Sequence, residues 1–165
     1  MMQKRSKLAL QAPGGASEIL LHTCCAPCST AIIERLIEHG IRPQIFFYNP
    51  NIFPKEEYER RKNECVRYIQ MLGLDFIDAD YAHEKWLKEV RGLEKEPERG
   101  ARCLACFKER LMVAALYAHQ HGYRVLATTL ASSRWKDLEQ IEEAGAYTAS
   151  LFPGLTFWAH NWRKD

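Results

Sequence analysis

The chain has 165 residues, of which 47% are apolar and 27% charged, and its formal net charge is +2. This length fits one domain and is too short for two ordinary ones, and the composition is that of a soluble globular protein. The small net charge excludes a strongly basic nucleic-acid binder, although it leaves room for a local basic patch.

The N-terminal residues 1–17 are expected to form a flexible leader, because Pro13, Gly14 and Gly15 break any regular structure there. The short apolar run at residues 8–10 is too small for a secretory signal. No run approaches the roughly 20 apolar residues of a membrane span. We therefore expect a cytoplasmic protein without a membrane partner, with a single domain over residues 18–165.

The first half of the domain alternates between strand and helix patterns. Residues 18–23 (EILLHT) form a short apolar run that predicts a buried strand, and apolar residues at helical spacing predict a helix over 29–39. An aromatic-rich strand is expected at 44–50 and a charged helix with an apolar stripe at 55–72. A third strand is expected at 75–80.

The second half repeats the alternation. A short helix is expected at 83–90, and a polar, breaker-rich loop at 92–102 leads into a long helix over 103–121. The remaining elements are a strand at 123–130, a helix at 133–144 and a strand at 156–162.

Alternating strands and helices predict an α/β fold, in which a mostly parallel sheet carries helices on both faces as a three-layer sandwich. In such sheets ligands bind beyond the carboxyl ends of the strands, where the strand order reverses. The segments that follow the strands at 18–23, 44–50 and 123–130 should therefore line one pocket.

Cys24, Cys25 and Cys28 form the strongest chemical signal, placed between the first strand and the first helix. Backbone N–H groups at the start of a helix favour thiolate over thiol. Clustered cysteines in a cytosolic protein indicate a metal or catalytic site rather than a disulfide framework.

Cys103 and Cys106 form a second cluster at the start of the long helix, beside Arg102. The fold should bring the two clusters to one end of the sheet. Cys65 stands apart, in the apolar stripe of its helix, and is expected to pack in the core.

Thiolates bind Zn²⁺ or iron–sulfur clusters in preference to hard cations, and the sequence separates these two poorly. A closed zinc site needs four ligands, whereas five cysteines are clustered here. Neighbouring side chains are expected to diverge, so Cys24 and Cys25 should not easily chelate one ion. This favours iron. Two alternatives remain: thiol–disulfide exchange by Cys25 and Cys28, and a zinc-stabilised RNA-binding module.

Four segments in this order, LLHTCCAPCST, FYNPNIFPKEEYERR, PERGARCLACFKERL and ATTLASSRWKD, resemble the QueH epoxyqueuosine reductases. The resemblance runs from about Ile19 to Ser133. It implies a fold similar to the adenine-nucleotide alpha-hydrolase (HUP) group. It also implies a cobalamin-independent reduction of epoxyqueuosine to queuosine in the anticodon loop of tRNA. The implied cofactors are a 4Fe-4S cluster and a further mononuclear iron.

The resemblance also implies roles for individual residues. Cys24, Cys25, Cys103 and Cys106 match the family's metal-binding cysteines, and Cys28 matches a position that is Cys or Asp in relatives. Tyr48 and Glu98 are candidate proton donors because of their expected position in the pocket, and not because of the resemblance. The candidate substrate-binding residues are Asn49, Asn51, Arg99, Arg102, Thr128, Thr129 and Ser132. Aromatic residues that could stack on splayed tRNA bases are Tyr48, Phe53 and Trp135.

The implied partners are tRNA carrying epoxyqueuosine and an external electron donor similar to ferredoxin or flavodoxin. The family pattern continues with another helix and a C-terminal Cys-x-Cys pair, whereas this sequence ends at Asp165. We expect either a truncated chain or a centre with fewer thiolates.

Overall fold

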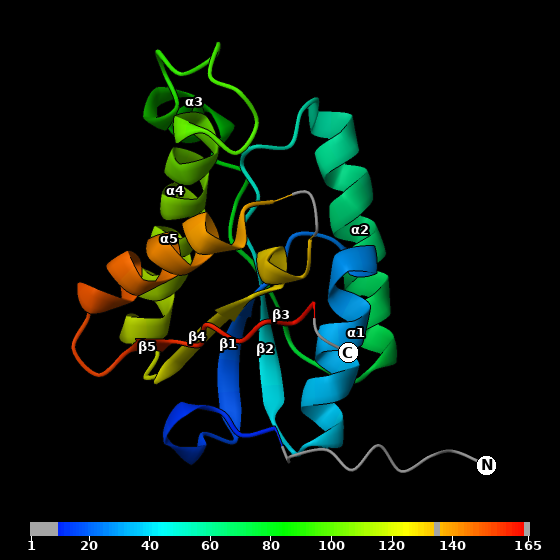
Figure 1. Ribbon diagram of the computed structural model, residues 1–165. Helices are drawn as coiled ribbons and strands as arrows, with labels where there is room; N and C mark the ends of the chain where they lie inside the picture. The colour runs from blue at the N-terminus through cyan, green and yellow to red at the C-terminus, as the bar shows by residue number, and fades with distance from the viewer. Residues whose placement is uncertain (1–9, 134–135, 164–165) are drawn as a thin grey trace.

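The computed structural model describes residues 10–133 and 136–163. They form three layers, in which a five-stranded parallel sheet lies between two layers of helices (Figure 1). Every pair of neighbouring strands is parallel. In sheet order the strands are β3 (Phe76–Asp78), β2 (Arg42–Phe47), β1 (Glu18–His22), β4 (Val125–Thr128) and β5 (Thr156–Phe157). The predicted α/β class and parallel sheet are confirmed.

The helices cover both faces of the sheet, with α1 and α2 on one side and α4 and α5 on the other (Figure 1). Their bounds are α1 (Ala26–Glu38), α2 (Lys55–Met71), α3 (His83–Glu89), α4 (Ala101–Gln120) and α5 (Leu138–Ser150). Alternate residues of β1 face opposite layers: Leu21 packs in a cluster with Ile33 of α1, and Leu20 packs in a second cluster with Ala114 of α4. Because helices cover both faces of the sheet, the side chains on both sides of the central strand are buried.

The strand order reverses at β1, the central strand, which pairs with β2 along one edge and with β4 along the other. Crossover connections leave β1 toward β2 on one side, while β4 lies on the other side. Ligands of doubly wound sheets bind at such a reversal, beyond the carboxyl ends of the strands. The cysteine segment after β1 lies at this point.

Three helices begin at residues other than those expected, and α4 differs least, since it starts at Ala101 rather than at residue 103. Helix α1 starts at Ala26 rather than at residue 29, because Pro27 fits the first helical turn, where its missing N–H costs nothing. Helix α5 starts at Leu138 rather than at residue 133. Asp137 caps it, because its carboxylate accepts hydrogen bonds from the backbone N–H of Glu139 (3.0 Å) and Gln140 (3.3 Å).

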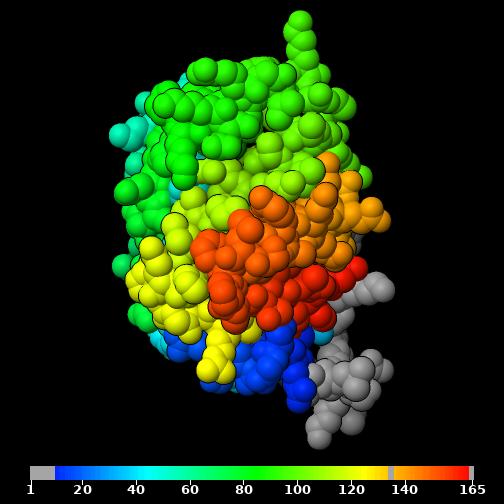
Figure 2. Space-filling model, turned by 90° about the vertical axis from the view of Figure 1, so that its left-hand side faces the viewer, coloured from blue at the N-terminus to red at the C-terminus, as the bar shows by residue number. Residues whose placement is uncertain are grey.

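Strands β4 and β5 are shorter than predicted. β4 ends at Thr128, whose hydroxyl accepts a hydrogen bond from Leu130 N (3.1 Å), and the chain continues as a 3₁₀ turn, η2 (Thr129–Ser132). After β5 the chain turns so that Trp158 packs edge-on against Trp162, with ring centroids 5.2 Å apart. Figure 2 shows α5 (orange) and the chain through β5 (red) next to each other on the surface.

Part of the expected leader packs against the domain. Leu10 and Ala12 belong to the main core cluster, and a 3₁₀ turn, η1 (Pro13–Gly15), leads into β1. Residues 1–9 lie outside the described residues. Among the described helices, none combines the length and the hydropathy that crossing a bilayer requires.

Candidate metal centre

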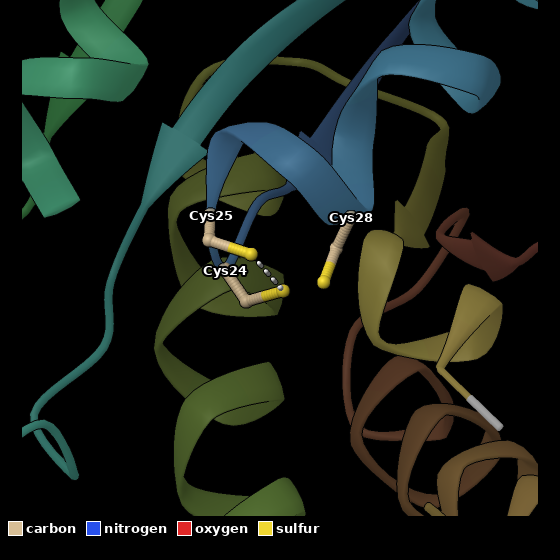
Figure 3. A group of neighbouring side chains, drawn as sticks. All are labelled: Cys24, Cys25 and Cys28. Carbon is tan, nitrogen blue, oxygen red and sulfur yellow. Dashed lines mark hydrogen bonds between the residues drawn. The ribbon is translucent and has the colours of Figure 1, made fainter. Parts of the chain in front are cut away.

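The sulfur atoms of Cys24, Cys25 and Cys28 point toward one another at the end of β1 (Figure 3). All three lie within 4.8 Å of each other, and the Sγ atoms of Cys24 and Cys25 are 4.0 Å apart. The expectation that these neighbouring side chains diverge is therefore wrong. The chain turns from β1 into α1 at Cys25, the residue before the first helical one, and this turn brings both sulfurs to the same side.

The three thiols form a hydrogen-bonded group that favours one negative charge. The pKa of Cys24 is held well below its usual range, because the thiols of Cys25 and Cys28 donate hydrogen bonds to its sulfur; the nearby Arg110 guanidinium contributes further. The same hydrogen bonds raise the pKa values of Cys25 and Cys28, which keep their protons. A metal ion that replaced these protons would bind three thiolates.

Three of the predicted substrate-binding residues lie beneath this cysteine segment. Thr129 Oγ1 accepts a hydrogen bond from Cys24 N (3.1 Å) and lies 3.4 Å from its sulfur. Ser132 Oγ donates to Cys28 O (2.9 Å). Thr128 and Thr129 are buried, with 1% and 0% of their surface exposed. The structure places these hydroxyls where they fix the backbone of the cysteine segment.

His22, at the end of β1, completes this support. Its Nε2 donates to the carbonyl of Tyr48 (2.9 Å), since a carbonyl can only accept, and its Nδ1 therefore accepts from the hydroxyl of Thr128 (2.9 Å). Burial lowers the pKa of His22 to about 4, with a smaller contribution from Arg110. The imidazole is neutral at physiological pH, and its two hydrogen bonds connect the end of β1 to the ends of β2 and β4.

The second cysteine pair opens helix α4 and faces a hollow of about 360 Å³. Trp86 Nε1 donates a hydrogen bond to Cys106 Sγ (3.2 Å), and Arg99 N donates to Cys103 Sγ (3.4 Å). The guanidinium of Arg102 lies 5.5 Å from the ring centre of Trp86. The hollow is lined by Asn51, Trp86, Glu96, Pro97, Glu98, Arg102, Cys103 and Cys106.

Arg110 links the two cysteine groups. This residue of α4 is 3% exposed, and its Nη1 lies 3.9 Å from Cys106 Sγ. Its Nη2 donates to Asn49 Oδ1 (2.6 Å), and Asn49 Nδ2 donates in turn to the carbonyl of Thr23 (2.9 Å), next to Cys24. Within the described part of the chain, Cys103 and Cys106 stay outside the group of three sulfurs that could hold one ion.

The candidate proton donors lie in different surroundings. Tyr48 is buried, and its hydroxyl donates to Glu109 Oε1 (2.9 Å); burial, and then Glu109, raise the pKa of this phenol. Glu98 lines the hollow beside Cys103 and Cys106. The structure thus places Glu98, and not Tyr48, on the surface of this hollow.

The remaining predicted residues divide between the hollow and the protein interior. Asn51 lines the hollow, and its side-chain oxygen is buried without a hydrogen-bond partner among the described residues. Asn49 is fully buried and binds Arg110. Arg99 is exposed, has a left-handed backbone conformation (φ 68°), and its carbonyl accepts from Gln140 Nε2 (2.7 Å).

Two residues that sequence reasoning did not single out, Trp86 and Arg110, contact Cys106 directly. A signal for Arg110 was present, because it follows Cys106 by four residues on the same helix and therefore lies on the same face. The signal for Trp86 was absent, since its hydrogen bond spans 20 residues between different helices.

The three stacking candidates also separate. Tyr48 is buried, and Trp135 lies outside the described residues. Phe53 is 73% exposed and stacks on His83, with ring centroids 5.6 Å apart. His83 stacks in turn on Trp86 at 5.7 Å, so a column of rings leads from the exposed Phe53 to the wall of the hollow.

The sequence matches the family model for "Epoxyqueuosine reductase QueH" over residues 19–165. Three proteins named epoxyqueuosine reductase QueH illustrate the similarity. The chain is 45% identical to the protein of Acinetobacter baylyi over 98% of this chain and 74% of that protein. It is 47% identical to the protein of Haemophilus influenzae (98% and 65%) and 46% identical to that of Histophilus somni (94% and 64%).

The chain thus spans about two thirds to three quarters of the length of these three relatives. The match covers both cysteine groups, the hollow and Arg110. The chain belongs to the QueH family of epoxyqueuosine reductases.

Proposed function

We propose that this chain reduces epoxyqueuosine to queuosine in tRNA, without cobalamin, with the help of an iron–sulfur centre bound by its cysteines. Family membership supports the reaction class. The observation that carries the proposal is the group of three sulfurs within 4.8 Å at the reversal of the strand order, where α/β sheets bind their ligands.

The donor set fits iron better than structural zinc. A closed zinc site needs four ligands, whereas the group of sulfurs offers three in the described part of the chain, and thiolate is the general ligand of iron–sulfur clusters. Cys103 and Cys106 add two sulfurs across Arg110. The five cysteines together would hold a 4Fe-4S cluster and a further mononuclear iron.

The reaction takes two electrons and two protons, converts the epoxide to an alkene and releases water. The bound centre would pass on electrons from an external ferredoxin-like or flavodoxin-like donor and would polarise the epoxide oxygen. Glu98 is the better proton donor of the two candidates, because it lines the hollow beside Cys103 and Cys106. The hydroxyl of Tyr48 already donates a hydrogen bond to Glu109.

Substrate binding is proposed for the polar residues around the hollow. The buried side-chain oxygen of Asn51 accepts no hydrogen bond from any described residue and could accept one from the substrate, and Arg102 offers a cation on the same wall. Arg99 lies next to this wall, at the start of α4. Thr128, Thr129 and Ser132 would act indirectly, through the cysteine segment that they support.

The tRNA partner is supported by the exposed ring of Phe53, which is held by His83 beside the hollow. Sequence-specific RNA binding uses such rings to stack on unpaired loop bases. A base stacked on Phe53 would place its neighbour near the hollow that contains Cys103 and Cys106. We place the protein in the cytoplasm, where this substrate is found.

The test is a turnover assay under anaerobic conditions, with tRNA that carries epoxyqueuosine and a chemical reductant, read by mass spectrometry of the released nucleosides. We expect queuosine from the wild-type chain and from Cys65→Ala. Cys24→Ala and Cys106→Ala should form none, because each removes a ligand of the centre.

Retained turnover in Cys24→Ala or Cys106→Ala would contradict the proposal. Measurements of metal content, tRNA binding and disulfide reduction on the same samples distinguish two other functions. A chain that binds zinc and tRNA but forms no queuosine would be a zinc-stabilised RNA-binding module. A chain without metal that reduces disulfides, and loses this activity in Cys25→Ala and Cys28→Ala, would be a thiol–disulfide oxidoreductase.

A further inference from the structure

Arg110 is a buried cation that forms no ion pair with a carboxylate in the described part of the chain. Its side chain is 3% exposed, and its Nη2 donates to the neutral amide oxygen of Asn49 (2.6 Å). Its Nε is buried and has no hydrogen-bond partner among the described residues. Burial of a charge is costly unless an anion and a full set of hydrogen bonds offset it. We therefore expect an anion beside Arg110 that offsets the cost of burying its charge.

The acidic and basic groups that surround Arg110 narrow the choice of that anion. Glu109 precedes it on α4, but this carboxylate already accepts from Tyr48 (2.9 Å) and pairs with Lys85 (3.2 Å). His22 of β1 cannot supply an anion, because its two ring nitrogens bond the carbonyl of Tyr48 (2.9 Å) and the hydroxyl of Thr128 (2.9 Å). The remaining candidates are sulfur atoms: Cys106, 3.9 Å from Nη1, and Cys24 in the segment that Asn49 anchors.

We propose that Arg110 is a positioning residue for the metal centre, whose guanidinium compensates the negative charge of the bound sulfur atoms and supplies N–H donors to them from between the two cysteine groups. This inference rests on the proposed iron–sulfur centre and adds a residue to it. Arg110 touches Cys106 on one side and is joined through Asn49 to the residue before Cys24 on the other.

The chemistry of the guanidinium suits this role. It carries a permanent charge and offers five donors in a planar array, so it can bind an amide oxygen and anionic sulfurs at the same time. A cation next to an iron–sulfur centre stabilises the reduced state, which is the more negative one, and net charge and hydrogen bonds to sulfur are known to set the potential of such centres. Arg110 should therefore both favour assembly and raise the reduction potential.

The test replaces Arg110 by Met, which keeps an unbranched apolar side chain but removes the charge, and by Lys, which keeps the charge but not the planar donors. Lys108→Met is the matched control: it removes a charge from the same helix, where Lys108 lies over the ring of Tyr147 (5.0 Å) instead of near a cysteine. Three properties are measured: thermal unfolding without metal, iron and sulfide per chain after anaerobic reconstitution, and the midpoint potential by EPR-monitored titration.

We expect Arg110→Met to bind less than half of the wild-type iron and sulfide, or to hold a centre whose midpoint potential is lower. Arg110→Lys should fall between Met and wild type, and Lys108→Met should match wild type in both properties. Wild-type metal content together with an unchanged potential in Arg110→Met would overturn the inference. These readouts are independent of turnover, so a chain that assembles the centre but forms no queuosine would contradict the proposed function alone.

A measurement on the wild-type chain covers the case in which the Met variant fails to fold. Protein labelled with ¹⁵N-arginine is reconstituted, reduced and studied by pulsed EPR. A guanidinium that donates to the centre should give a ¹⁵N hyperfine coupling that persists in Arg102→Met. Absence of any ¹⁵N coupling would overturn the inference.

Discussion

At the scale of single residues, burial separates Cys65 from the five clustered cysteines. Cys65 lies on α2 with 0% of its surface exposed, in the core cluster that also contains Tyr58 and Ile69. Burial raises the pKa of its thiol to about 12, with smaller contributions from Cys24 and Cys25. The prediction that Cys65 packs in the core is confirmed.

This pKa makes Cys65 a source of instability at alkaline pH. Between pH 9 and 12 the folded chain keeps the thiol proton while the unfolded chain loses it, so the folded state loses stability as pH rises through that window. At about pH 10.5 the loss from this residue should be about 2 kcal/mol. Urea unfolding at about pH 8 and pH 10.5 should therefore show a smaller decrease for Cys65→Ala than for wild type. An equal decrease would contradict the assigned cause.

The sequence was sufficient to find the cysteines but not their surroundings. Three cysteines within five residues, and a Cys-x-x-Cys at a helix start, are visible without a structure. The contact between Arg110 and Asn49 joins residues 61 positions apart, so no local pattern encodes it. The convergence of Cys24 and Cys25 depends on the turn into α1, which a general rule about neighbouring side chains does not capture.

At the scale of elements, the packing of α5 on β5 depends on Gly145. A Cβ atom at this position would lie 2.4 Å from the ring of Phe157, which is closer than real carbon contacts allow. Gly145 lies inside α5, where alanine would otherwise be the better helix former by about 1 kcal/mol. Tight packing, and not backbone freedom, is therefore the reason for glycine here.

Gly145→Ala should destabilise the chain by roughly 1–3 kcal/mol, because overpacking outweighs helix propensity. In a Phe157→Ala background the same change should be neutral or stabilising, since the ring that causes the clash is gone. Urea unfolding of the four chains in this double-mutant cycle measures the difference. A Gly145→Ala chain that is more stable than wild type would show that the clash does not determine the packing.

Periodicity predicted every main helix and strand, while the bounds depended on single side chains. Helix α5 follows its Asp137 cap, and β4 ends where the Thr128 hydroxyl binds the next turn. Such hydrogen bonds compete with the regular ladder, and the strength of the competition cannot be judged from hydrophobic patterns. The alternation of elements, which depends only on burial, was predicted correctly.

At the scale of the whole molecule, the strand order brings the candidate site together from distant segments. Cys24 follows β1, Asn49 follows β2 and Thr129 follows β4. At one end of the sheet Cys24 N donates to Thr129 Oγ1, and Asn49 Nδ2 donates to the carbonyl of Thr23, the residue before Cys24. The parallel sheet, and the end of the sheet at which the candidate site lies, could be predicted from alternating elements. The contribution of α4, which adds Cys106 and Arg110, required the tertiary structure.

The exposed ring of Phe53, on the surface beside this site, is expected to contribute to the affinity for tRNA. Phe53→Ala should weaken binding of an anticodon stem-loop about 5- to 150-fold, because stacking on an aromatic side chain is worth about 1–3 kcal/mol per base. Phe53→Trp should bind at least as well as wild type. The salt dependence should be the same in all three chains, since the phosphate contacts remain. Fluorescence anisotropy at several salt concentrations measures both quantities.

The control for Phe53 is Met71→Ala, which removes another exposed apolar side chain (82%) at the far end of α2. Its affinity should equal that of wild type. If Phe53→Ala bound the stem-loop as tightly as wild type, base stacking at this position would be ruled out. If the wild-type chain self-associated and Phe53→Ala did not, with unchanged RNA affinity, the ring would instead be assigned to self-association.

The central claim is that two separate groups of cysteines bind one iron–sulfur centre, and anaerobic determination of iron and acid-labile sulfide tests it most directly. We predict both elements in the wild-type chain and in Cys65→Ala, and loss of most of both in Cys24→Ala and in Cys106→Ala. Zinc without sulfide in the wild-type chain, or wild-type iron and sulfide in Cys106→Ala, would contradict the claim.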